Sequence, residues 1–295
     1  MPALLPPTLW GNHSLEWGQR TYIMGIVNVT PDSFSGDGLI EENLTEDALV
    51  QRAIALAQRF VAEGATFIDI GGESTRPGAP PTPAHQELAR VLPVLRALRA
   101  ILPEEVILSI DTYKAEVADR AIEAGASLIN DIWALRRDPA MASVARSWKV
   151  PIVLMANMRN RQQKYEIVSD VIRFLANSID TALEAGIAWE HIIIDPGIGF
   201  GTTPEENLTL LRRLGELRAL GRPILLGTSR KSTIGLVLGG LPASERLEGT
   251  AATVALGIAQ GADIVRVHDA REMTRVVKMS DAIVRGVFTL PKTST

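Results

Sequence analysis

The sequence predicts a single-domain α/β protein, a (β/α)8 barrel of the TIM type in which eight parallel strands are each followed by a helix. Short apolar runs alternate with stretches of helical periodicity along the chain, a pattern typical of a parallel sheet. About eight such units fit into the 295 residues, which favours a closed barrel over an open, doubly wound sheet. No GxGxxG motif follows the first strand, so an open dinucleotide-binding fold lacks its main signature.

A short N-terminal extension precedes the barrel. Residues 1–20 contain a Pro-Pro and a Gly-Asn step before the apolar stretch Leu15–Trp17. This composition predicts a small hairpin packed against the main body. The barrel is expected over residues 21–290, because no linker or change of composition divides that range.

The expected strands are short apolar runs, as in strands that are buried on both faces. The clearest is the run of three isoleucines at 192–194, which leads into Asp195 and is ended by the sequence PGIGFG. In chain order the strands are expected at 22–27, within 65–72, and at 106–110, 127–129, 151–154, 192–194, 223–226 and 262–265.

Capping and stop signals place the helices between these strands. Ser, Thr, Asp and Glu favour helix starts, and glycine favours helix ends. The clearest start is Thr203-Pro204-Glu205-Glu206, which combines a capping box with proline at the first helical position. Other starts are expected at Thr45, Thr82-Pro83, Asp138-Pro139, Glu166, Ser244 and Asp269, and ends at Gly64, Gly125, Gly186, Gly261 and Arg285.

The composition argues against several classes of function. A formal net charge of −4 and an isoelectric point near 5.7 argue against a nucleic-acid-binding surface. The absence of cysteine excludes disulfides and thiolate metal sites, and it suits a reducing compartment. The N-terminus lacks the features of a signal peptide, and no apolar run approaches the roughly 18 residues that span a membrane. We therefore expect a cytoplasmic protein that binds neither nucleic acid nor membranes.

Polar residues follow the carboxyl ends of most of the expected strands. In a closed barrel these ends converge on one face, where the active sites of this fold lie. Any one of these residues alone is more often a helix cap or part of a surface ion pair, but their convergence indicates a ligand site. The residues are Asn28, Glu73–Arg76, Asp111, Asn130, Asp195, Ser229–Lys231, Arg266 and His268.

One half of this set suits a flat heterocycle. Asp111, Asn130 and Asp195 supply hydrogen-bond acceptors and an amide donor. A carboxylate can accept two parallel N–H bonds from an amidine-like edge. This half of the predicted site therefore recognises a base.

The other half suits an anion. Four residues supply positive charge and hydrogen-bond donors: Arg76, Lys231, Arg266 and His268. Such groups bind phosphate or diphosphate. Asn28 and the hydroxyl groups of the loop after it offer oxygen ligands to a hard cation.

Seven stretches of the chain closely resemble dihydropteroate synthase, the folate-pathway enzyme family that sulfonamides inhibit. They follow the family order over nearly the whole chain, so the resemblance is specific. The stretches are MGIVNVTPDSFS (24–35), IDIGGESTRPGA (68–79), SIDTYKAEVA (109–118), AGASLINDI (124–132), DPGIGFG (195–201), GTSRKSTIG (227–235) and RLEGTAATVALGIAQGADIVRVHD (246–269).

The resemblance implies that the chain condenses (7,8-dihydropterin-6-yl)methyl diphosphate with p-aminobenzoate, giving dihydropteroate and diphosphate with Mg²⁺ as cofactor. It implies that Asp111, Asn130 and Asp195 hold the pterin, with Lys231 near its carbonyl and ring nitrogen. It also implies a homodimer, whose interface the sequence does not locate.

The resemblance assigns further roles by motif position. Arg266 would lie along the pterin and, with His268 and Asn28, hold the diphosphate, and Asn28 would be the direct protein ligand to Mg²⁺. Met155 and Phe200 are expected to add to substrate binding. The residues expected around p-aminobenzoate are Phe34, Thr75, Arg76, Pro77 and Ser232.

The loop that carries Phe34 and Asp37 is expected to close over the site and exclude water. Three positions depart from the usual family pattern. The chain has SFSGDG where the family usually has SFSDGG, so Asp37 is displaced by one residue. Ala156-Asn157 occupies a position where the family usually has a histidine. Thr202 occupies a position where lysine is common.

Other interpretations of these residues stay open. A pterin-binding methyltransferase of the same barrel type would share the two aspartates and the asparagine, but it would not need the anion-binding loops GESTRPG and SRKS. A non-enzymatic pterin-binding relative would be expected to have lost Asn28, Arg76, Lys231 or His268, all of which are present. A purely structural barrel leaves the converging charges unexplained.

Overall fold

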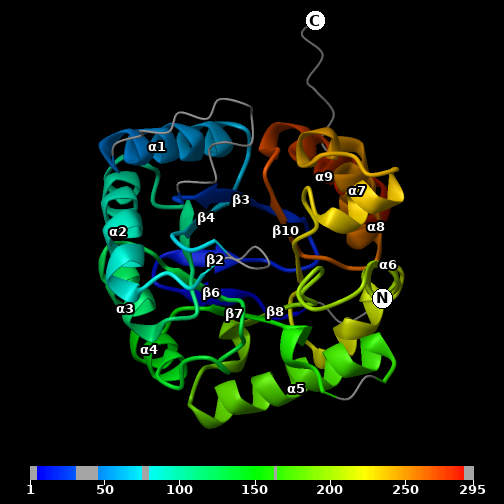
Figure 1. Cartoon of the computed structure of the whole chain (residues 1–295), viewed down its shortest axis with the longest axis horizontal. Coiled ribbons are helices and arrows are strands. Elements are labelled where there is room, and N and C mark those ends of the chain that lie inside the picture. Colours follow the sequence, from blue (N-terminus) through cyan, green and yellow to red (C-terminus); the bar gives the residue numbers. More distant parts are fainter. Residues whose placement is uncertain (1–4, 31–45, 75–79, 163–164, 289–295) are drawn as a thin grey trace, which may run out of the picture.

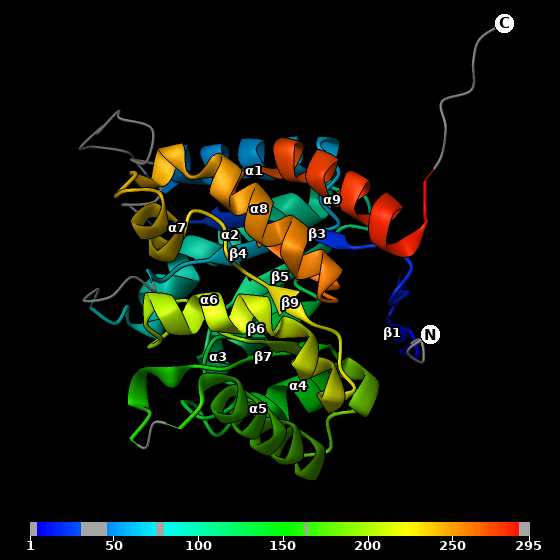
Figure 2. The same cartoon turned by 90° about the vertical axis from the view of Figure 1, so that its right-hand side faces the viewer.

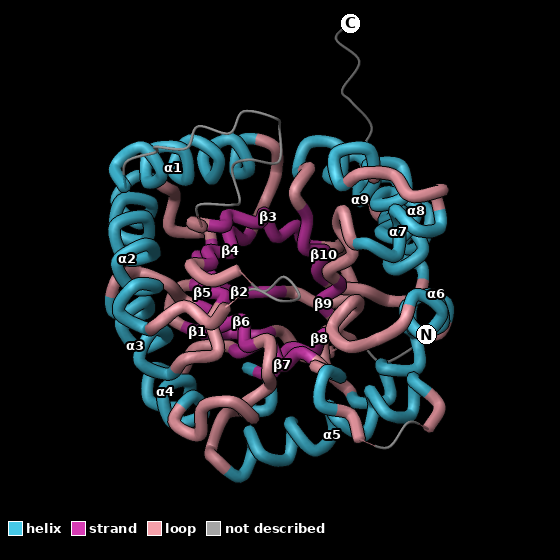
Figure 3. Tube along the Cα trace, viewed as in Figure 1, coloured by secondary structure: helices cyan, strands magenta, loops and turns pink. Residues whose placement is uncertain are grey.

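The computed structural model describes residues 5–30, 46–74, 80–162 and 165–288. In these ranges eight parallel strands form one sheet in the order β8-β7-β6-β5-β4-β3-β10-β9. A parallel bridge between Ile194 in β8 and Ile224, just before β9, closes the sheet into a barrel. Figure 3 shows the ring of strands with the helices outside it. The predicted (β/α)8 barrel is confirmed.

The barrel strands are nearly all buried along their length, as their apolar sequences predict. Inward side chains fill the barrel and outward ones pack under the helices, so both faces of each strand are covered. The strands are β3 (Tyr22–Asn28), β4 (Phe67–Gly71), β5 (Ile107–Asp111), β6 (Leu128–Asp131), β7 (Ile152–Met155), β8 (Ile192–Asp195), β9 (Leu225–Leu226) and β10 (Ile264–Val267).

The helices form an outer layer around the strands (Figure 1). No helix in the described part of the chain is long and apolar enough to cross a membrane. The helices are α1 (Glu46–Ala62), α2 (Ala84–Ile101), α3 (Ala115–Glu123), α4 (Met141–Trp148), α5 (Ile167–Glu184), α6 (Pro204–Arg212), α7 (Ser232–Val237), α8 (Leu247–Ala259) and α9 (Ala270–Arg285).

The predicted N-terminal hairpin is also present, as β1 (Thr8–Trp10) paired antiparallel with β2 (His13–Leu15). Trp10 Nε1 donates to the carbonyl of Ser127 at 2.7 Å, and Thr8 Oγ1 donates to the carbonyl of Glu190 at 2.7 Å. Ser127 and Glu190 lie just before β6 and β8, so the hairpin packs at the amino ends of the strands. Figure 2 shows β1 at one end of the molecule. The opposite end of the barrel is left for a site.

Two helix starts agree with the sequence signals. Thr203 Oγ1 accepts from the Glu206 N–H at 3.2 Å, and the Glu206 carboxylate accepts from the Thr203 N–H at 2.9 Å, which completes the predicted capping box of α6. Glu166 caps α5 by accepting from the N–H groups of Val168 and Ser169. Local signals suffice here because both partners lie within one turn.

Four other helix starts differ from the prediction, and the first is that of α4, which begins at Met141 rather than at Asp138-Pro139. Pro83 is the residue before α2 rather than its first residue. Ser244 lies in a 3₁₀ turn, and α8 begins at Leu247. Asp269 makes no side-chain cap on α9. Instead its carboxylate accepts from Arg230 Nε at 3.0 Å. A tertiary ion pair has therefore replaced the expected local cap.

Candidate active site

The carboxyl ends of the strands bring the predicted polar residues together. Asn28, Asp111, Met155 and Asp195 are each the last residue of a strand. Asp111 pairs in register with Asn130, and Met155 pairs with Asp195 on the neighbouring strand. The expectation that these residues share one face of the barrel is confirmed.

The centre of the site is Asp69, which is absent from the set of residues predicted from the sequence. Its side chain is fully buried within β4. It accepts hydrogen bonds from Ser109 Oγ at 2.6 Å, from Asn130 Nδ2 at 3.0 Å and from Arg266 Nε at 2.6 Å. A signal existed in the sequence, because a carboxylate inside an apolar strand is costly unless it is paired. Asp69 thus orients two residues of the predicted site.

Arg266 is held between two carboxylates. Its Nη2 donates to Asp111 Oδ2 at 2.7 Å, while its Nε contacts Asp69. Burial lowers the pKa of Arg266, but the two carboxylates outweigh this and raise its pKa. Burial raises the pKa of Asp111 above its usual value, although Arg266 opposes the shift. The ion pair with Arg266 nevertheless fixes the position of the Asp111 carboxyl group at the end of β5.

Asp195 and Lys231 form the adjacent part of the site. Asp195 Oδ1 accepts from the Gly197 N–H at 2.7 Å. Burial raises the pKa of Asp195 to about 6, with Lys231 opposing the shift. Burial likewise lowers the pKa of Lys231 to about 8, with Asp195 opposing the shift. At neutral pH the site therefore holds a carboxylate and an ammonium group, and both are close to titration.

The DPGIGFG loop positions Lys231. The ammonium group of Lys231 donates to the carbonyl of Ile198 and lies 4.8 Å from the centre of the Phe200 ring. Gly197 has φ +70°, and a Cβ atom there would lie only 1.8 Å from the carbonyl oxygen of Ala156. Glycine is required at this position because the loop packs directly against the backbone after β7.

Ala156 and Asn157, which stand where a histidine is usual, both form hydrogen bonds to neighbouring segments of the barrel. Ala156 N donates to the carbonyl of Asp195 at 2.9 Å, and Asn157 Nδ2 donates to the carbonyl of Ile132 at 3.0 Å. Met155, the preceding residue, is buried at the end of β7. The two residues in place of the family histidine therefore tie the loop after β7 to its neighbours on both sides.

His268 lies at the end of β10 against Ser229. Its Nδ1 is 3.0 Å from Ser229 Oγ. Burial lowers the pKa of His268 to about 4, and the charges of Arg266 and Arg230 add to this effect. The imidazole is therefore neutral at neutral pH and supplies a hydrogen-bonding group rather than the positive charge expected from the sequence. A bound anion would raise its pKa.

Asn28 is the residue predicted to bind a metal. A Cβ atom on Gly71 would lie 3.4 Å from Asn28 Oδ1 and 3.5 Å from Asp111 Cβ, so Gly71 lets these two side chains approach. Among the described residues no group of three or more His, Asp or Glu could hold a metal ion. A single amide oxygen fits Mg²⁺ that takes its other ligands from water and substrate phosphates.

Of the residues predicted to bind p-aminobenzoate or to close over the site, only Ser232 lies in the described part of the chain. Ser232 is the exposed first residue of α7, directly after Lys231. The predictions for the first loop and for the loop after β4 lie outside the described residues; they concern Phe34, Asp37, Thr75, Arg76 and Pro77.

The base of the loop after β4 is described. Glu73 Oε1 accepts from the Tyr113 hydroxyl at 3.0 Å. The ammonium group of Lys114 forms ion pairs with both Glu73 and the fully buried Glu87. Glu73 was predicted only as one of the polar residues after the strands, because its partners cannot be read from sequence spacing.

A family model described as pterin binding enzyme matches residues 24–268. Its range includes every described site residue above. The chain therefore belongs to the pterin-binding enzyme family, a class of barrel enzymes.

Comparison with individual relatives shows where in this family the chain belongs. The chain is 48% identical over 276 residues to dihydropteroate synthase of Clostridium beijerinckii, covering 93% of this chain and 98% of the relative. It is 48% identical over 270 residues to dihydropteroate synthase of Bacillus subtilis, covering 92% and 91%. Within the family the chain thus falls among the dihydropteroate synthases, which are transferases of folate biosynthesis.

Solved structures agree with this placement. Dihydropteroate synthase of Clostridium difficile, solved in the presence of pteroic acid, superposes with a TM-score of 0.84 at 46% identity, covering 92% of this chain and 99% of that one. The Xanthomonas albilineans enzyme with 4-aminobenzoic acid superposes with a TM-score of 0.87 at 39% identity, covering 96% and 100%. The Yersinia pestis enzyme in complex with a sulfonamide drug superposes with a TM-score of 0.85 at 37% identity, covering 96% and 100%.

Proposed function

We propose that this chain condenses (7,8-dihydropterin-6-yl)methyl diphosphate with p-aminobenzoate to give 7,8-dihydropteroate and diphosphate. The observation that carries the proposal is the pair of adjoining clusters at the barrel mouth. Asp69, Arg266 and Asp111 form one cluster, and Asp195 with Lys231 forms the other. Buried carboxylates suit the N–H edge of a pterin, and the cations beside them suit a diphosphate.

In this proposal the pterin is held by side chains of the barrel mouth that are oriented by their neighbours. Asn130 donates its amide to Asp69, which fixes the plane of that side chain. Asp195, with a pKa of about 6, is mostly ionised at pH 7 and accepts N–H bonds from the ring. Lys231 lies beside it with its charge largely retained, because its pKa is about 8. It donates to the ring carbonyl and nitrogen.

The reaction is a dissociative substitution at the exocyclic methylene. The C–O bond to the diphosphate breaks, and its electron pair leaves with the diphosphate oxygen. The pterin ring between Asp111 and Asp195 delocalises the positive charge that develops. The amine nitrogen of p-aminobenzoate then attacks the methylene carbon and loses a proton. No covalent bond to the enzyme is formed.

The departing diphosphate is stabilised by preorganised donors, which usually give the largest catalytic contribution. Arg266, His268 and Asn28 serve this role from neighbouring strand ends. Mg²⁺, when bound with Asn28 as its protein ligand, would neutralise part of the diphosphate charge. We further propose that Phe34 and Asp37 exclude water from the site, and that Thr75, Arg76, Pro77 and Ser232 bind p-aminobenzoate.

A sulfonamide would occupy the p-aminobenzoate position in this proposal, and the Yersinia pestis relative in complex with such a drug supports it. Inhibition by a sulfonamide should then be competitive with p-aminobenzoate. We also propose that the protein is cytoplasmic, as its sequence leads us to expect.

We also propose that the chain is a homodimer. Helices α8 and α9 pack against each other on one side of the barrel. They expose large apolar side chains, including Leu256 at 66%, Met279 at 61% and Ile283 at 71%. Such a surface suits a second copy of the chain. Light scattering should give twice the chain mass, and Ile283→Glu should shift the mass to that of the monomer.

The reaction is tested by incubating the chain with the pterin diphosphate, p-aminobenzoate and Mg²⁺. The expected result is a product with the mass of 7,8-dihydropteroate. The Bacillus subtilis relative serves as the positive control. No product under conditions where that relative turns over would overturn the proposal.

A further inference from the structure

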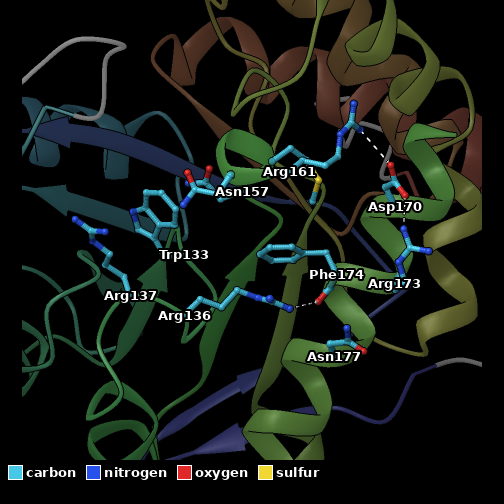
Figure 4. Close-up of a pocket in the computed structure, with 11 residues that line it drawn as sticks. Trp133, Arg136, Arg137, Asn157, Arg161, Asp170, Arg173, Phe174 and Asn177 are labelled. Carbon is cyan, nitrogen blue, oxygen red and sulfur yellow. Dashed lines mark hydrogen bonds and ion pairs between the residues drawn. The ribbon is translucent and has the colours of Figure 1, made fainter. Parts of the chain in front are cut away.

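A cavity of about 400 Å³ lies beside the barrel mouth, between the loops after β6 and β7 and helix α5 (Figure 4). None of the described residues assigned to the active site lines it. Four arginines line it, with Asp170 as the single carboxylate among the lining residues. The arginines are Arg136, Arg137, Arg161 and Arg173. The cavity therefore carries an excess of positive charge.

The loop after β6 forms one wall of the cavity and is held in a fixed conformation. Ala134 and Leu135 both have left-handed backbone conformations, with φ of +50° and +67°. The buried carboxylate of Asp131 holds this turn by accepting from the Leu135 N–H at 2.7 Å. Strained turns of this kind persist only where the surroundings fix them. This turn places Arg136 and Arg137 on the cavity.

Arg161 forms part of the wall from the loop after β7. Its side chain is only 7% exposed, and it forms ion pairs with Glu206 and with Asp170, whose Oδ2 lies 3.4 Å from Nη1. Nε and Nη1 of Arg161 are buried, and apart from the ion pair with Asp170 they form no hydrogen bond within the described part of the chain. Asp170 and Glu206 therefore balance the charge of this wall, and the excess positive charge of the cavity comes from Arg136 and Arg137.

Arg136 and Arg137 are stacked rather than ion-paired. The Arg136 guanidinium lies 4.1 Å from the centre of the Phe174 ring, and that of Arg137 lies 5.6 Å from the Trp133 ring. Arg136 Nη2 also donates to the carbonyl of Phe174 at 3.4 Å, and neither arginine forms a salt bridge with a described residue. Stacking covers a face of the guanidinium and leaves the in-plane N–H groups that are not already bonded available to oxygen.

We propose that this cavity binds a small multivalent oxyanion, either a phosphate ester or a di- or tricarboxylate. Fork-shaped guanidinium groups match the oxygen spacing of both kinds of anion. The volume lies at the small end of the range of metabolite pockets, roughly 300–1,000 Å³. The inference does not depend on the proposed reaction, because it concerns binding outside the active site.

The test is calorimetric titration of the full chain with inorganic phosphate and, separately, with citrate. The wild type is compared with Arg136→Gln/Arg137→Gln. The matched control is Arg96→Gln/Arg212→Gln, which removes the same charge from exposed positions on α2 and α6. Any binding of the probe in the active site is common to all three proteins, so only the cavity distinguishes them.

The wild type and the control should bind at least one probe equally. The cavity variant should bind it roughly tenfold or more weakly, since charge-assisted hydrogen bonds are removed. A loss confined to phosphate identifies a phosphate ester, and a loss confined to citrate identifies a polycarboxylate. Equal affinities in all three proteins, or no binding by the wild type, would overturn the inference.

Tryptophan fluorescence gives a second readout. The bound probe should change the emission of the wild type, and Trp133→Phe should remove that change. If the double variant does not fold, Arg137→Gln alone replaces it, because Arg137 is exposed and contacts only the Trp133 ring among the interactions described. An unchanged fluorescence response in Trp133→Phe would contradict the site.

Discussion

Asp69 Oδ2 lies 2.6 Å from Arg266 Nε, joining β4 to β10 inside the barrel mouth. The same oxygen accepts from Asn130 Nδ2 at 3.0 Å. One buried carboxylate therefore sets the positions of an arginine and an amide that the proposed reaction uses. Because these residues are far apart in the sequence, the closed barrel is what brings them together.

Asp69→Asn should weaken pterin binding by roughly tenfold to a hundredfold, since a charged hydrogen bond to Arg266 is worth about 1.5–3 kcal/mol. Calorimetric titration with the pterin measures the effect. Ser109→Ala is the matched control, because it removes one neutral hydrogen bond to Asp69 and should cost only about 1 kcal/mol of stability. Unchanged pterin affinity in Asp69→Asn would show that Asp69 does not position the site.

Lys231→Ala should lower kcat/KM by about 10² to 10³, the loss typical when a preorganised charge is removed. The melting temperature should change little, because the hydrogen bond of the side chain within the described part of the chain goes to a backbone carbonyl. Near-normal turnover in this variant would refute the role assigned to Lys231.

Arg266→Ala should lower turnover and also destabilise the fold. It leaves Asp69 and Asp111 facing each other without a cation, and breaking a buried pair costs about 3–5 kcal/mol. Urea unfolding measures the stability. Arg266→Lys should recover part of the stability but little of the activity, because an ammonium group cannot contact both carboxylates in the same planar geometry. Full activity in Arg266→Lys would contradict this account.

The pH profile of kcat/KM should be bell-shaped. Below a pKa of about 6, Asp195 is protonated and loses its capacity as a double acceptor, so pterin binding should weaken as the pH falls. Above a pKa of about 8, Lys231 loses its charge, so activity should fall as the pH rises. Asp195→Asn should weaken pterin binding and flatten the acid limb only. An acid limb unchanged in that variant would assign it to another group.

Comparing Gly197→Ala with Gly239→Ala separates the loss of stability caused by a steric clash from the loss caused by backbone strain alone. Both glycines have positive φ, but a Cβ at Gly197 would lie 1.8 Å from the Ala156 carbonyl oxygen, whereas one at Gly239 meets nothing within 4 Å. Gly239→Ala should cost roughly 1–2 kcal/mol of unfolding free energy. Gly197→Ala should cost more than about 4 kcal/mol. Equal losses in urea unfolding would show that the loop can move away from Ala156.

The sequence predicted most of the fold because its signals are local. Apolar runs and turn residues defined the strands, and the capping box at Thr203 lies within one turn. Asp111 and Asp195 were predicted because each stands where an apolar run ends. Asp69 was missed because it stands inside such a run, and its partners belong to strands whose neighbourhood depends on register.

The charge state of His268 and the role of Asp269 also depended on tertiary context. Burial and two nearby arginines keep His268 neutral, which spacing alone does not reveal. Asp269 pairs with Arg230 instead of capping its own helix, because the loop after β9 brings that arginine within 3.0 Å. Motifs located these residues, but packing decided what each of them does.

The most direct test of the central claim is to follow diphosphate release and dihydropteroate formation together, with Mg²⁺, in the presence and absence of p-aminobenzoate. The proposed reaction predicts equal amounts of both products when both substrates are present and no dihydropteroate without p-aminobenzoate. Pterin binding with no dihydropteroate in the complete mixture would contradict it and indicate a pterin-binding protein without synthase activity.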